Sequence, residues 1–193
     1  MKGKIAVAVL AGGKSSRMGR DKGMMLFNGK TMIEHVLTAA SEIAEDIFII
    51  ANNEVYDNFS YPCFADEKID CGPIGGIFTA LLQAKVDKVL VLSCDVPMMS
   101  ASVLKKLVGL SADEKVLAAA HKGEIQPLCA IYDKKCLTYF REAIGSGNFK
   151  MKKVLQDLDA KIIDFDSTDY KGAFLNINTP VDLANLQSLY DKK

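Results

Sequence analysis

The residues best suited to chemistry lie in the stretch 10–22, whose sequence is LAGGKSSRMGRDK. Its glycine pair and its cations are Gly12, Gly13, Arg17, Arg20 and Lys22. Glycines let backbone N–H groups approach a ligand closely, and arginine and lysine neutralise phosphate charge. Because the stretch directly follows the apolar run 5–9, we interpret it as a polyphosphate-binding loop at the end of a strand.

Two common phosphate-binding motifs are excluded. Gly13-Lys14-Ser15 matches the end of a P-loop, but the first glycine of that motif would fall on Ala8, inside the strand. The dinucleotide fingerprint G-x-G-x-x-G is absent because the two glycines are adjacent. An ordinary turn with a solvated basic run is the alternative interpretation. The length of the pattern and its place after the first strand favour the functional one.

A carboxylate that could bind a metal follows another apolar run. Asp95 comes directly after residues 89–93 and Cys94, and the chain then turns at Pro97. Mg²⁺ prefers oxygen ligands, often one or two carboxylates together with substrate phosphates. Aspartate also caps turns, but its place at a strand end beside a phosphate loop favours metal binding.

The elements that must position these residues alternate along the chain. Apolar runs predict strands at 5–10, 47–51, 89–93, 116–120, 128–132 and 160–163. Helical patterns cover 31–44, 73–84, 100–107, 136–144 and 151–158, and a final helix follows Thr179. This alternation predicts an α/β fold with a mainly parallel mixed sheet covered on both faces. Ligands bind such sheets beyond the carboxyl ends of the strands, where the glycine loop and Asp95 both fall.

Composition narrows the class of protein. A length of 193 residues suits one domain, 1–193, and the 24 basic and 24 acidic residues give no net charge. A nucleic-acid partner would need a basic face, and no apolar run approaches the ~20 residues that span a bilayer. The strand that starts near Met1 leaves no room for a signal peptide. The five cysteines form no C-x-x-C pair, which favours free thiols in a cytoplasmic protein.

Four motifs together resemble one family. They are the stretch 10–22, Gly72-Pro73-Ile74-Gly75-Gly76, Cys94-Asp95-Val96-Pro97 and Asn176-Ile177-Asn178-Thr179-Pro180. The likeness covers almost the whole chain and is closest to the molybdenum cofactor guanylyltransferases, which are nucleotidyltransferases. The resemblance implies a three-layer α/β/α Rossmann-like domain. It also implies transfer of GMP from Mg-GTP to the phosphate of molybdopterin, with release of pyrophosphate.

The resemblance also implies roles for individual residues. Asp95 would bind Mg²⁺ and lie against the nucleotide, and Arg17 and Lys22 would stabilise the triphosphate and the departing pyrophosphate. The GTP-binding set would be Leu10, Ala11, Gly12, Gly13, Lys22, Asp66 and Asp95. Asp66 would pair with guanine N1–H and N2–H₂ or with ribose hydroxyls, and Asp70 is the alternative. Either acid could also be a solvated loop residue.

The acceptor side has four candidates, Lys150, Lys152, Asn176 and Asn178. A solvated helix face explains the two lysines equally well, and a turn before the Thr179 cap explains Asn178 equally well. Asp182 falls three residues after Thr179, where it supports the helix N-terminus more readily than a metal. The implied partners are GTP and molybdopterin, with transient contacts to molybdoenzymes or cofactor-delivery proteins.

The sequence departs from the family at two positions. Ile50 stands where some members have an asparagine, although Asn52 is near, and Gln126 stands where the family often has a histidine. Two other functions remain open at this point. One is a cytidylyl- or sugar/polyol-phosphate nucleotidyltransferase of the same fold, and the other is a GTP-binding protein without catalytic activity.

Overall fold

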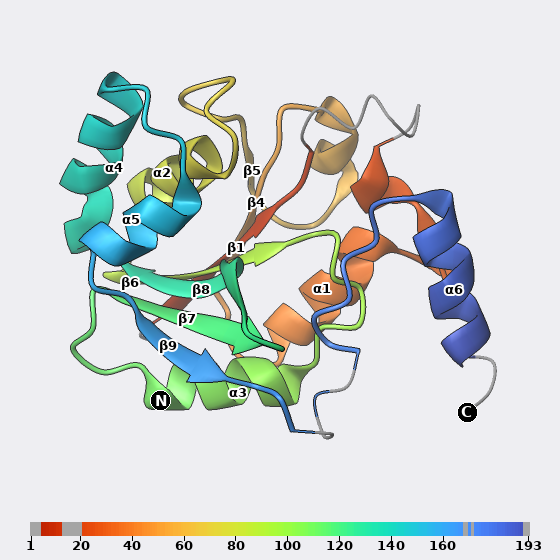
Figure 1. The fold of residues 1–193 in the computed structure, drawn as a ribbon. Helices are drawn as coiled ribbons and strands as arrows, with labels where there is room; N and C mark the ends of the chain where they lie inside the picture. The colour runs from red at the N-terminus through yellow and green to blue at the C-terminus, as the bar shows by residue number, and fades with distance from the viewer. Residues whose placement is uncertain (1–4, 13–20, 168–169, 171, 191–193) are drawn as a thin grey trace.

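The computed structural model describes residues 5–12, 21–167, 170 and 172–190. Its main sheet has seven strands in the order β5-β4-β1-β6-β8-β7-β9 (Figure 1). Neighbouring strands are parallel except where β8 pairs with β6 and β7, so β8 runs against the rest of this sheet. The bounds are β1 Ile5–Leu10, β4 Ile47–Ile50, β5 Cys63–Phe64, β6 Lys88–Ser93, β7 Val116–His121, β8 Glu124–Asp133 and β9 Lys161–Asp164.

Helices cover both faces of the sheet, which confirms the predicted three-layer α/β/α fold. Alternate residues of β1 enter different cores: Val7 and Val9 pack on the side of α1 and α3, whereas Ala6 and Ala8 pack on the side of α2, α4 and α5. Because both faces are buried, the central strands are apolar throughout. The helix bounds are α1 Met32–Ser41, α2 Pro73–Gln83, α3 Ala101–Leu110, α4 Leu137–Gly145, α5 Met151–Asp157 and α6 Pro180–Tyr190.

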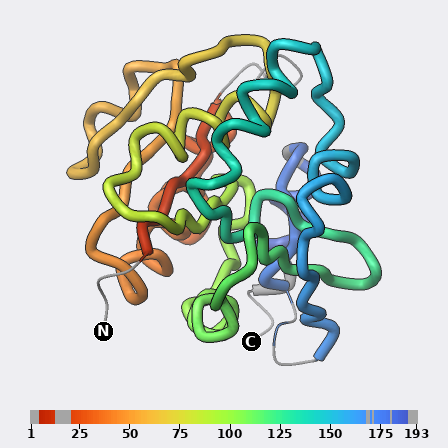
Figure 2. Tube along the Cα trace, turned by 90° about the vertical axis from the view of Figure 1, so that its left-hand side faces the viewer, coloured from red at the N-terminus to blue at the C-terminus, as the bar shows by residue number. Residues whose placement is uncertain are grey.

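Early and late segments of the chain separate only in part. Figure 2 shows orange and yellow segments on the left and light-blue ones on the right, but Figure 1 shows the C-terminal helix beside the N-terminal part of the chain, where Leu186 packs with Phe27 and Met32. The chain still crosses between them near the site, because the Ile177 N–H donates to the Asp95 carbonyl at 2.9 Å. Residues from both ends of the sequence can therefore meet at one edge of the sheet.

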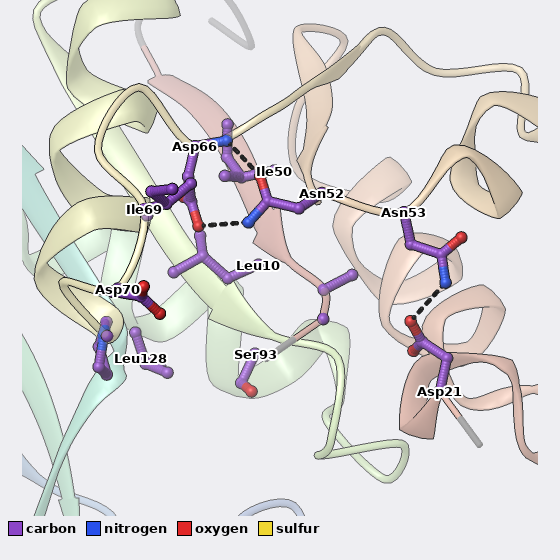
Figure 3. Close-up of a pocket in the computed structure, with 15 residues that line it drawn as sticks. Leu10, Asp21, Ile50, Asn52, Asn53, Asp66, Ile69, Asp70, Ser93 and Leu128 are labelled. Atoms are coloured by element: carbon purple, nitrogen blue, oxygen red, sulfur yellow. Dashed lines mark hydrogen bonds between the residues drawn. The ribbon is translucent and has the colours of Figure 1, made fainter. Parts of the chain in front are cut away.

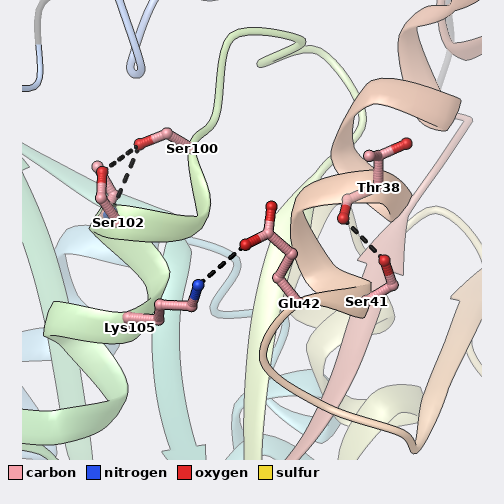
Figure 4. Close-up of polar contacts among 7 residues, drawn as sticks. Thr38, Ser41, Glu42, Ser100, Ser102 and Lys105 are labelled. Carbon is pink, nitrogen blue, oxygen red and sulfur yellow. Dashed lines mark hydrogen bonds and ion pairs between the residues drawn. The ribbon is translucent and has the colours of Figure 1, made fainter.

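Polar residues fix the ends of the helices on the α1 and α3 side. Ser100 caps α3 as predicted, with its Oγ accepting from the Val103 N–H at 3.5 Å. The Lys105 ammonium of α3 lies 2.9 Å from the Glu42 carboxylate at the end of α1 (Figure 4). Both side chains are more than half exposed (57 % and 55 %). The pair therefore adds at most about 1 kcal/mol to stability, and apolar packing holds this layer.

The structure contains a small hairpin that the sequence does not predict. Strands β2 (Leu26–Phe27) and β3 (Lys30–Thr31) are joined by Asn28 and Gly29, both with positive φ. Two-residue strands carry too little periodic signal to be recognised. The hairpin buries Phe27 in a third apolar cluster, with Met32, Ile177 and Leu186, under α6.

Strand β8 is longer than the predicted 128–132, because it begins at Glu124. Its polar first residues and Pro127 hide the pattern of a strand. They pair with β7 across a two-residue turn, where Lys122 and Gly123 both have positive φ. The register then jumps between Ala118 and Ala119, so β8 bulges before it continues in the core.

Gly75 in α2 is predicted to be intolerant of a side chain. A Cβ there would lie 2.6 Å from the Lys68 carbonyl oxygen, a backbone atom that cannot move without the loop around it. We expect Gly75→Ala to lower the free energy of unfolding by about 1–3 kcal/mol, measured by urea denaturation. Gly109→Ala is the matched control, since a Cβ in α3 meets nothing within 4 Å. The control should gain about 0.5–1 kcal/mol. Equal stability changes in the two variants would contradict the predicted clash.

Candidate active site

Three parallel strands end together at one edge of the sheet. The Ala11 N–H donates to the Ile50 carbonyl at 2.9 Å, and the Cys94 N–H donates to the Leu10 carbonyl at 3.0 Å. These hydrogen bonds continue the pairing of β1 with β4 and with β6 by one residue. The loops that follow the three strands therefore start side by side, as predicted for a ligand site at the carboxyl ends.

A cavity of about 760 Å³ opens above these strand ends (Figure 3). Its size lies within the range of nucleotide and cofactor sites. Apolar side chains line it, namely Leu10, Ile50, Ile69 and Leu128. Three carboxylates, Asp21, Asp66 and Asp70, also line it. The walls therefore offer flat apolar contact together with a few hydrogen-bond acceptors.

Two hydrogen bonds hold Asp66 in place, but one of its carboxylate oxygens has no hydrogen-bond partner among the described residues. Its backbone N–H donates to Asn52 Oδ1 at 2.8 Å, and its Oδ2 accepts from Asn52 Nδ2 at 3.0 Å. Its Oδ1 is buried and has no hydrogen-bond partner among the described residues. Burial raises the pKa of this carboxyl group, and the Asn52 hydrogen bond opposes the rise. Such an acceptor is suited to a ligand donor.

Some of the other predicted nucleotide contacts line the same cavity, and some lie outside the described residues. Lys22 lines neither this cavity nor the smaller one described below, and Asp95 lines the smaller one. Asp70, the alternative to Asp66, is exposed there and has a φ of 60°. Leu10, Ala11 and Gly12 line the wall, and Gly12 is exposed with a φ of 92°. The Ala11 N–H is not available to a ligand, because it donates to the Ile50 carbonyl. Gly13 and Arg17 lie outside the described residues.

Lys22 is positioned by a residue that the sequence analysis missed. Asp21 Oδ1 accepts from the Gly23 N–H at 3.1 Å and from the Tyr56 hydroxyl, and Asp21 Oδ2 accepts from Asn53 Nδ2 at 3.3 Å. Burial raises the pKa of Tyr56, so its hydroxyl remains a donor. This anchoring fixes the turn that carries Lys22.

The Lys22 ammonium donates to Asn178 Oδ1 at 2.8 Å. The cation of the first loop therefore meets the fourth motif, which lies far along the chain. Asp182 caps the segment beside it, with Oδ2 accepting from the backbone N–H groups of Asn178 and Thr179 at 3.0 and 2.8 Å. The Thr179 side chain first, and then the backbone hydrogen bond from Asn178, lower the pKa of Asp182. Asp182 thus has the helix-capping role expected of it.

A second cavity, of about 170 Å³, adjoins the first. Ser93 and Leu128 line both cavities, and Asp95 and Asn176 line the smaller one. Asp95 Oδ1 is buried without a hydrogen-bond partner in the described part of the chain. A carboxylate oxygen of Asp95 is therefore free to accept a ligand close to Ser93, which lines both cavities.

The bulge in β8 builds the far wall of the smaller cavity. Residues 126–129 lie at the register jump and line it, together with Phe174. The Phe174 ring stacks on His121, with centroids 5.2 Å apart. The Tyr132 hydroxyl donates to the Pro127 carbonyl at 2.8 Å and fixes the bulge. Gln126, at the position of a family histidine, thus belongs to this wall.

The Asp95 carboxylate could hold a divalent metal ion whose other ligands come mainly from substrate. No three His, Cys, Asp or Glu residues gather into a metal site among the residues described. Mg²⁺ is commonly held by one or two carboxylates together with phosphate oxygens and water. The Asp95 oxygen, which has no partner among the described residues, could be one such carboxylate ligand. The described residues do not supply enough ligands to enclose a metal ion by themselves.

Three predicted acceptor residues line neither cavity. Lys150 and Lys152, at the start of α5, are exposed, and so is Asn178, which bonds to Lys22. Four residues that do shape the site, Asp21, Asn52, Asn53 and Tyr56, were not assigned roles by the sequence analysis. The Asp-Lys pair of the first motif carried a signal for Asp21. The contacts of the other three depend on tertiary structure.

Comparisons with known proteins agree on one family. The model of the MobA-like NTP transferase domain matches residues 7–162. A Flavobacterium johnsoniae protein named "Probable molybdenum cofactor guanylyltransferase" is 35 % identical over 92 % of this chain and 94 % of its own length. The "Molybdenum cofactor guanylyltransferase" of Vibrio parahaemolyticus is 32 % identical over 94 % of both chains.

A solved structure gives the same answer. The crystal structure of molybdopterin-guanine dinucleotide biosynthesis protein A from Archaeoglobus fulgidus superposes with a TM-score of 0.80 at 26 % identity. The match covers 97 % of this chain and all of the other. The fold and the strand order therefore belong to a nucleotidyltransferase scaffold.

The buried Asp66 Oδ1, which has no hydrogen-bond partner among the described residues, should lower the stability of the fold while it serves ligand binding. Because burial raises its pKa, the folded state loses stability as pH rises from the usual aspartate pKa through the raised one. We expect Asp66→Asn to raise the free energy of unfolding at pH 7 by about 1 kcal/mol, with the gain shrinking as pH falls to the usual aspartate range. Urea denaturation across this pH range measures it. Exposed Asp113→Asn is the control, and a pH-independent difference for Asp66→Asn would contradict the assignment.

Proposed function

The chain belongs to the MobA-like NTP transferase family, and on that premise we propose that it transfers GMP from GTP to the phosphate of molybdopterin. The observation that carries this proposal is the pair of adjoining cavities. The larger one has the size of a nucleotide site, the smaller one suits part of an acceptor, and Ser93 and Leu128 line both. Two substrates bound there would meet beside Asp95.

The reaction needs positioning more than proton transfer. An acceptor phosphate oxygen forms a bond to the α-phosphorus of GTP, and the bond from that phosphorus to the bridging oxygen breaks. Pyrophosphate leaves with the bonding electron pair. Because the attacking oxygen is already anionic at neutral pH, no general base is required. In phosphoryl transfer, alignment and charge stabilisation supply most of the rate.

The chain's own cations would stabilise the phosphates. Lys22 has a defined position between the Asp21 turn and Asn178, close to the fourth motif. Its ammonium would meet the negative charge that builds on the leaving pyrophosphate. Arg17, in the same loop, is assigned to the triphosphate on the sequence pattern alone.

A divalent metal fits the site at Asp95, and we propose that it is Mg²⁺. When bound there, Mg²⁺ would polarise the α-phosphate and neutralise its charge. Asp95 would hold the ion from the strand end, where the hydrogen bond from the Ile177 N–H to its carbonyl fixes the backbone. Asn176 and Asn178 would contact the acceptor from the same segment.

Base choice would rest on polar pairing in the larger cavity. Guanine offers adjacent donors at N1 and N2, and the Asp66 carboxylate can accept from both. Adenine presents an acceptor at N1, which would face the carboxylate unfavourably, and cytosine would leave part of the cavity unfilled. A site built on such pairing rejects a mismatched edge strongly.

Further parts of the proposal concern the whole molecule. Because Leu10 and Asn176 lie at opposite ends of the sequence and line adjoining cavities, we treat residues 1–193 as one functional domain. All five cysteines are unpaired, which supports a cytoplasmic location. No helix in the described part of the chain is long and apolar enough to cross a bilayer. Transient contacts with molybdoenzymes or cofactor-delivery proteins would pass the product on.

The decisive experiment is incubation with Mg²⁺, molybdopterin and each of GTP, ATP and CTP, scored for pyrophosphate release. Release with GTP above all is the expected result. Preference for CTP would place the chain with the cytidylyltransferases. Nucleotide binding without turnover on molybdopterin or on sugar and polyol phosphates would mark a binding protein.

Asp95→Asn is expected to keep the fold and lower kcat by at least about 100-fold, because an amide is a much poorer Mg²⁺ ligand than a carboxylate. Steady-state kinetics at several Mg²⁺ concentrations measure the loss. Asp113→Asn, an exposed change of the same chemistry, is the control. Near-normal turnover in Asp95→Asn would remove Asp95 from the metal site.

Lys22→Ala is expected to raise the barrier by about 2.7–4 kcal/mol, seen as a lower kcat with little change in unfolding free energy. The exposed Lys85→Ala variant controls for loss of one positive charge. If Lys22→Ala raised only the KM for GTP, Lys22 would bind the ground state and would not act in catalysis.

A further inference from the structure

We propose that Asn52 is a specificity-determining positioning residue, whose side-chain amide holds the Asp66 carboxylate in the orientation that selects guanine. The inference rests on the proposed function, because it takes GTP as the nucleotide and Asp66 as the acceptor of its base. It assigns a role to a residue that makes no contact with the reacting atoms. Three features of the structure support it.

The first feature is where Asn52 lies. The backbone pairing of β4 with the short edge strand β5 ends with hydrogen bonds from Ile49 N to Pro62 O at 2.8 Å and from Ala51 N to Phe64 O at 2.9 Å. Beyond these two backbone hydrogen bonds, the Asn52 side chain makes the next hydrogen bond between the two segments. It contacts Asp66, which lines the cavity.

The second feature is that Asn52 makes two contacts of different kinds with one residue. Its Oδ1 accepts from the Asp66 backbone N–H at 2.8 Å, and its Nδ2 donates to Asp66 Oδ2 at 3.0 Å (Figure 3). The first contact places the main chain, and the second fixes rotation of the carboxylate. A simple strand tether would need only the first.

The third feature is that the donor is neutral. Asn52 satisfies part of one carboxylate oxygen and leaves the negative charge uncompensated, while Asp66 Oδ1 stays buried without a partner among the described residues. A lysine or arginine in this place would neutralise the acid and compete with a base for its oxygens. The amide therefore orients the acceptor and keeps its capacity for ligand N–H groups.

The apolar walls cannot make the choice of base. Leu10, Ile50 and Leu128 present apolar surface to the cavity, and such surface packs on any base with similar strength. Among the polar residues of the lining, Asp66 has a buried oxygen without a hydrogen-bond partner among the described residues. We therefore assign discrimination to Asp66 and to the residue that orients it.

The test is binding of GTP and of inosine triphosphate, which lacks the N2 amine, to the full chain without acceptor. Asn52→Asp is the key variant because it keeps an oxygen to accept the Asp66 N–H but puts a second carboxylate, in place of the neutral donor, about 3.0 Å from Asp66 Oδ2. Asn52→Ala removes both contacts. Asn58→Ala is the matched control, since Asn58 is exposed and its Nδ2 donates to the Val55 carbonyl at 3.1 Å outside the cavity lining.

We expect Asn52→Asp to weaken GTP binding by about tenfold or more, because the added carboxylate repels the triphosphate and shares a proton with Asp66. The shared proton occupies an Asp66 oxygen, so the preference for GTP over inosine triphosphate should also fall. In an Asp66→Ala background, Asn52→Asp should have no further effect on this preference, because Asn52 acts through Asp66. The control should retain the wild-type preference.

Two results would overturn the inference. One is an unchanged preference for GTP over inosine triphosphate in Asn52→Asp. That result would leave Asn52 only the structural role of holding the Asp66 backbone. The other is an equal loss of both nucleotides that persists in the Asp66→Ala background. Because no acceptor is present, failure of the molybdopterin assignment leaves this readout unaffected. A wild-type preference for CTP would show failure of the guanine assignment itself before any variant is made.

Discussion

The hydrogen bond from the Cys94 N–H to the Leu10 carbonyl is the interaction on which the site depends. It is the last link between β1 and β6 at 3.0 Å, and the Ala11 N–H makes the corresponding link to β4. Beyond these links the backbone is released from the sheet. Cys94 itself is buried, and burial raises its pKa to about 12, so its thiol is an inert filler that holds the turn. The glycine loop and Asp95 can start side by side only because β1 and β6 end at the same level, with Leu10 paired to Ser93.

The single antiparallel strand of the described sheet gives the second cavity. If β8 paired with β6 and β7 without interruption, its side chains would continue the flat apolar surface of the sheet. The register jump between Ala118 and Ala119 instead leaves residues 127–129 without partners in β7. Tyr132 then secures the displaced Pro127 carbonyl. A bulge at a sheet edge is a common way to direct residues toward a ligand, and here it supplies a wall that faces Asp95.

The sequence predicted the fold well because long apolar runs dominate it. Strands such as 5–10 and 89–93 are buried on both faces, so their composition alone marks them, and helix starts at Ser100 and Thr179 carry capping residues. The two-residue strands and the polar start of β8 lack such signals. At the site, the motifs predicted roles for Asp95 and Lys22, and the sequence offered Asp66 with Asp70 as its alternative. It could not find Tyr56, Asn52 or Asn53, because each acts through a hydrogen bond to a residue distant in the chain. Lys150 and Lys152 were predicted from their charge and line neither cavity, and charge alone does not locate a side chain.

The sheet order gives a physical reason for the proposed arrangement of substrates. Along β5-β4-β1-β6, Asp66 follows the first strand, the glycine loop follows β1, and Asp95 follows β6. Three strand spacings, roughly 14 Å in all, separate the two carboxylates, whose buried oxygens have no partner among the described residues. A polyanion placed against either acid alone would be repelled. A nucleotide laid along the strand ends avoids this, because its base donors would meet Asp66 while its phosphates lie by the cationic loop. At the far end, a metal ion would convert Asp95 from a repulsive group into an anchor.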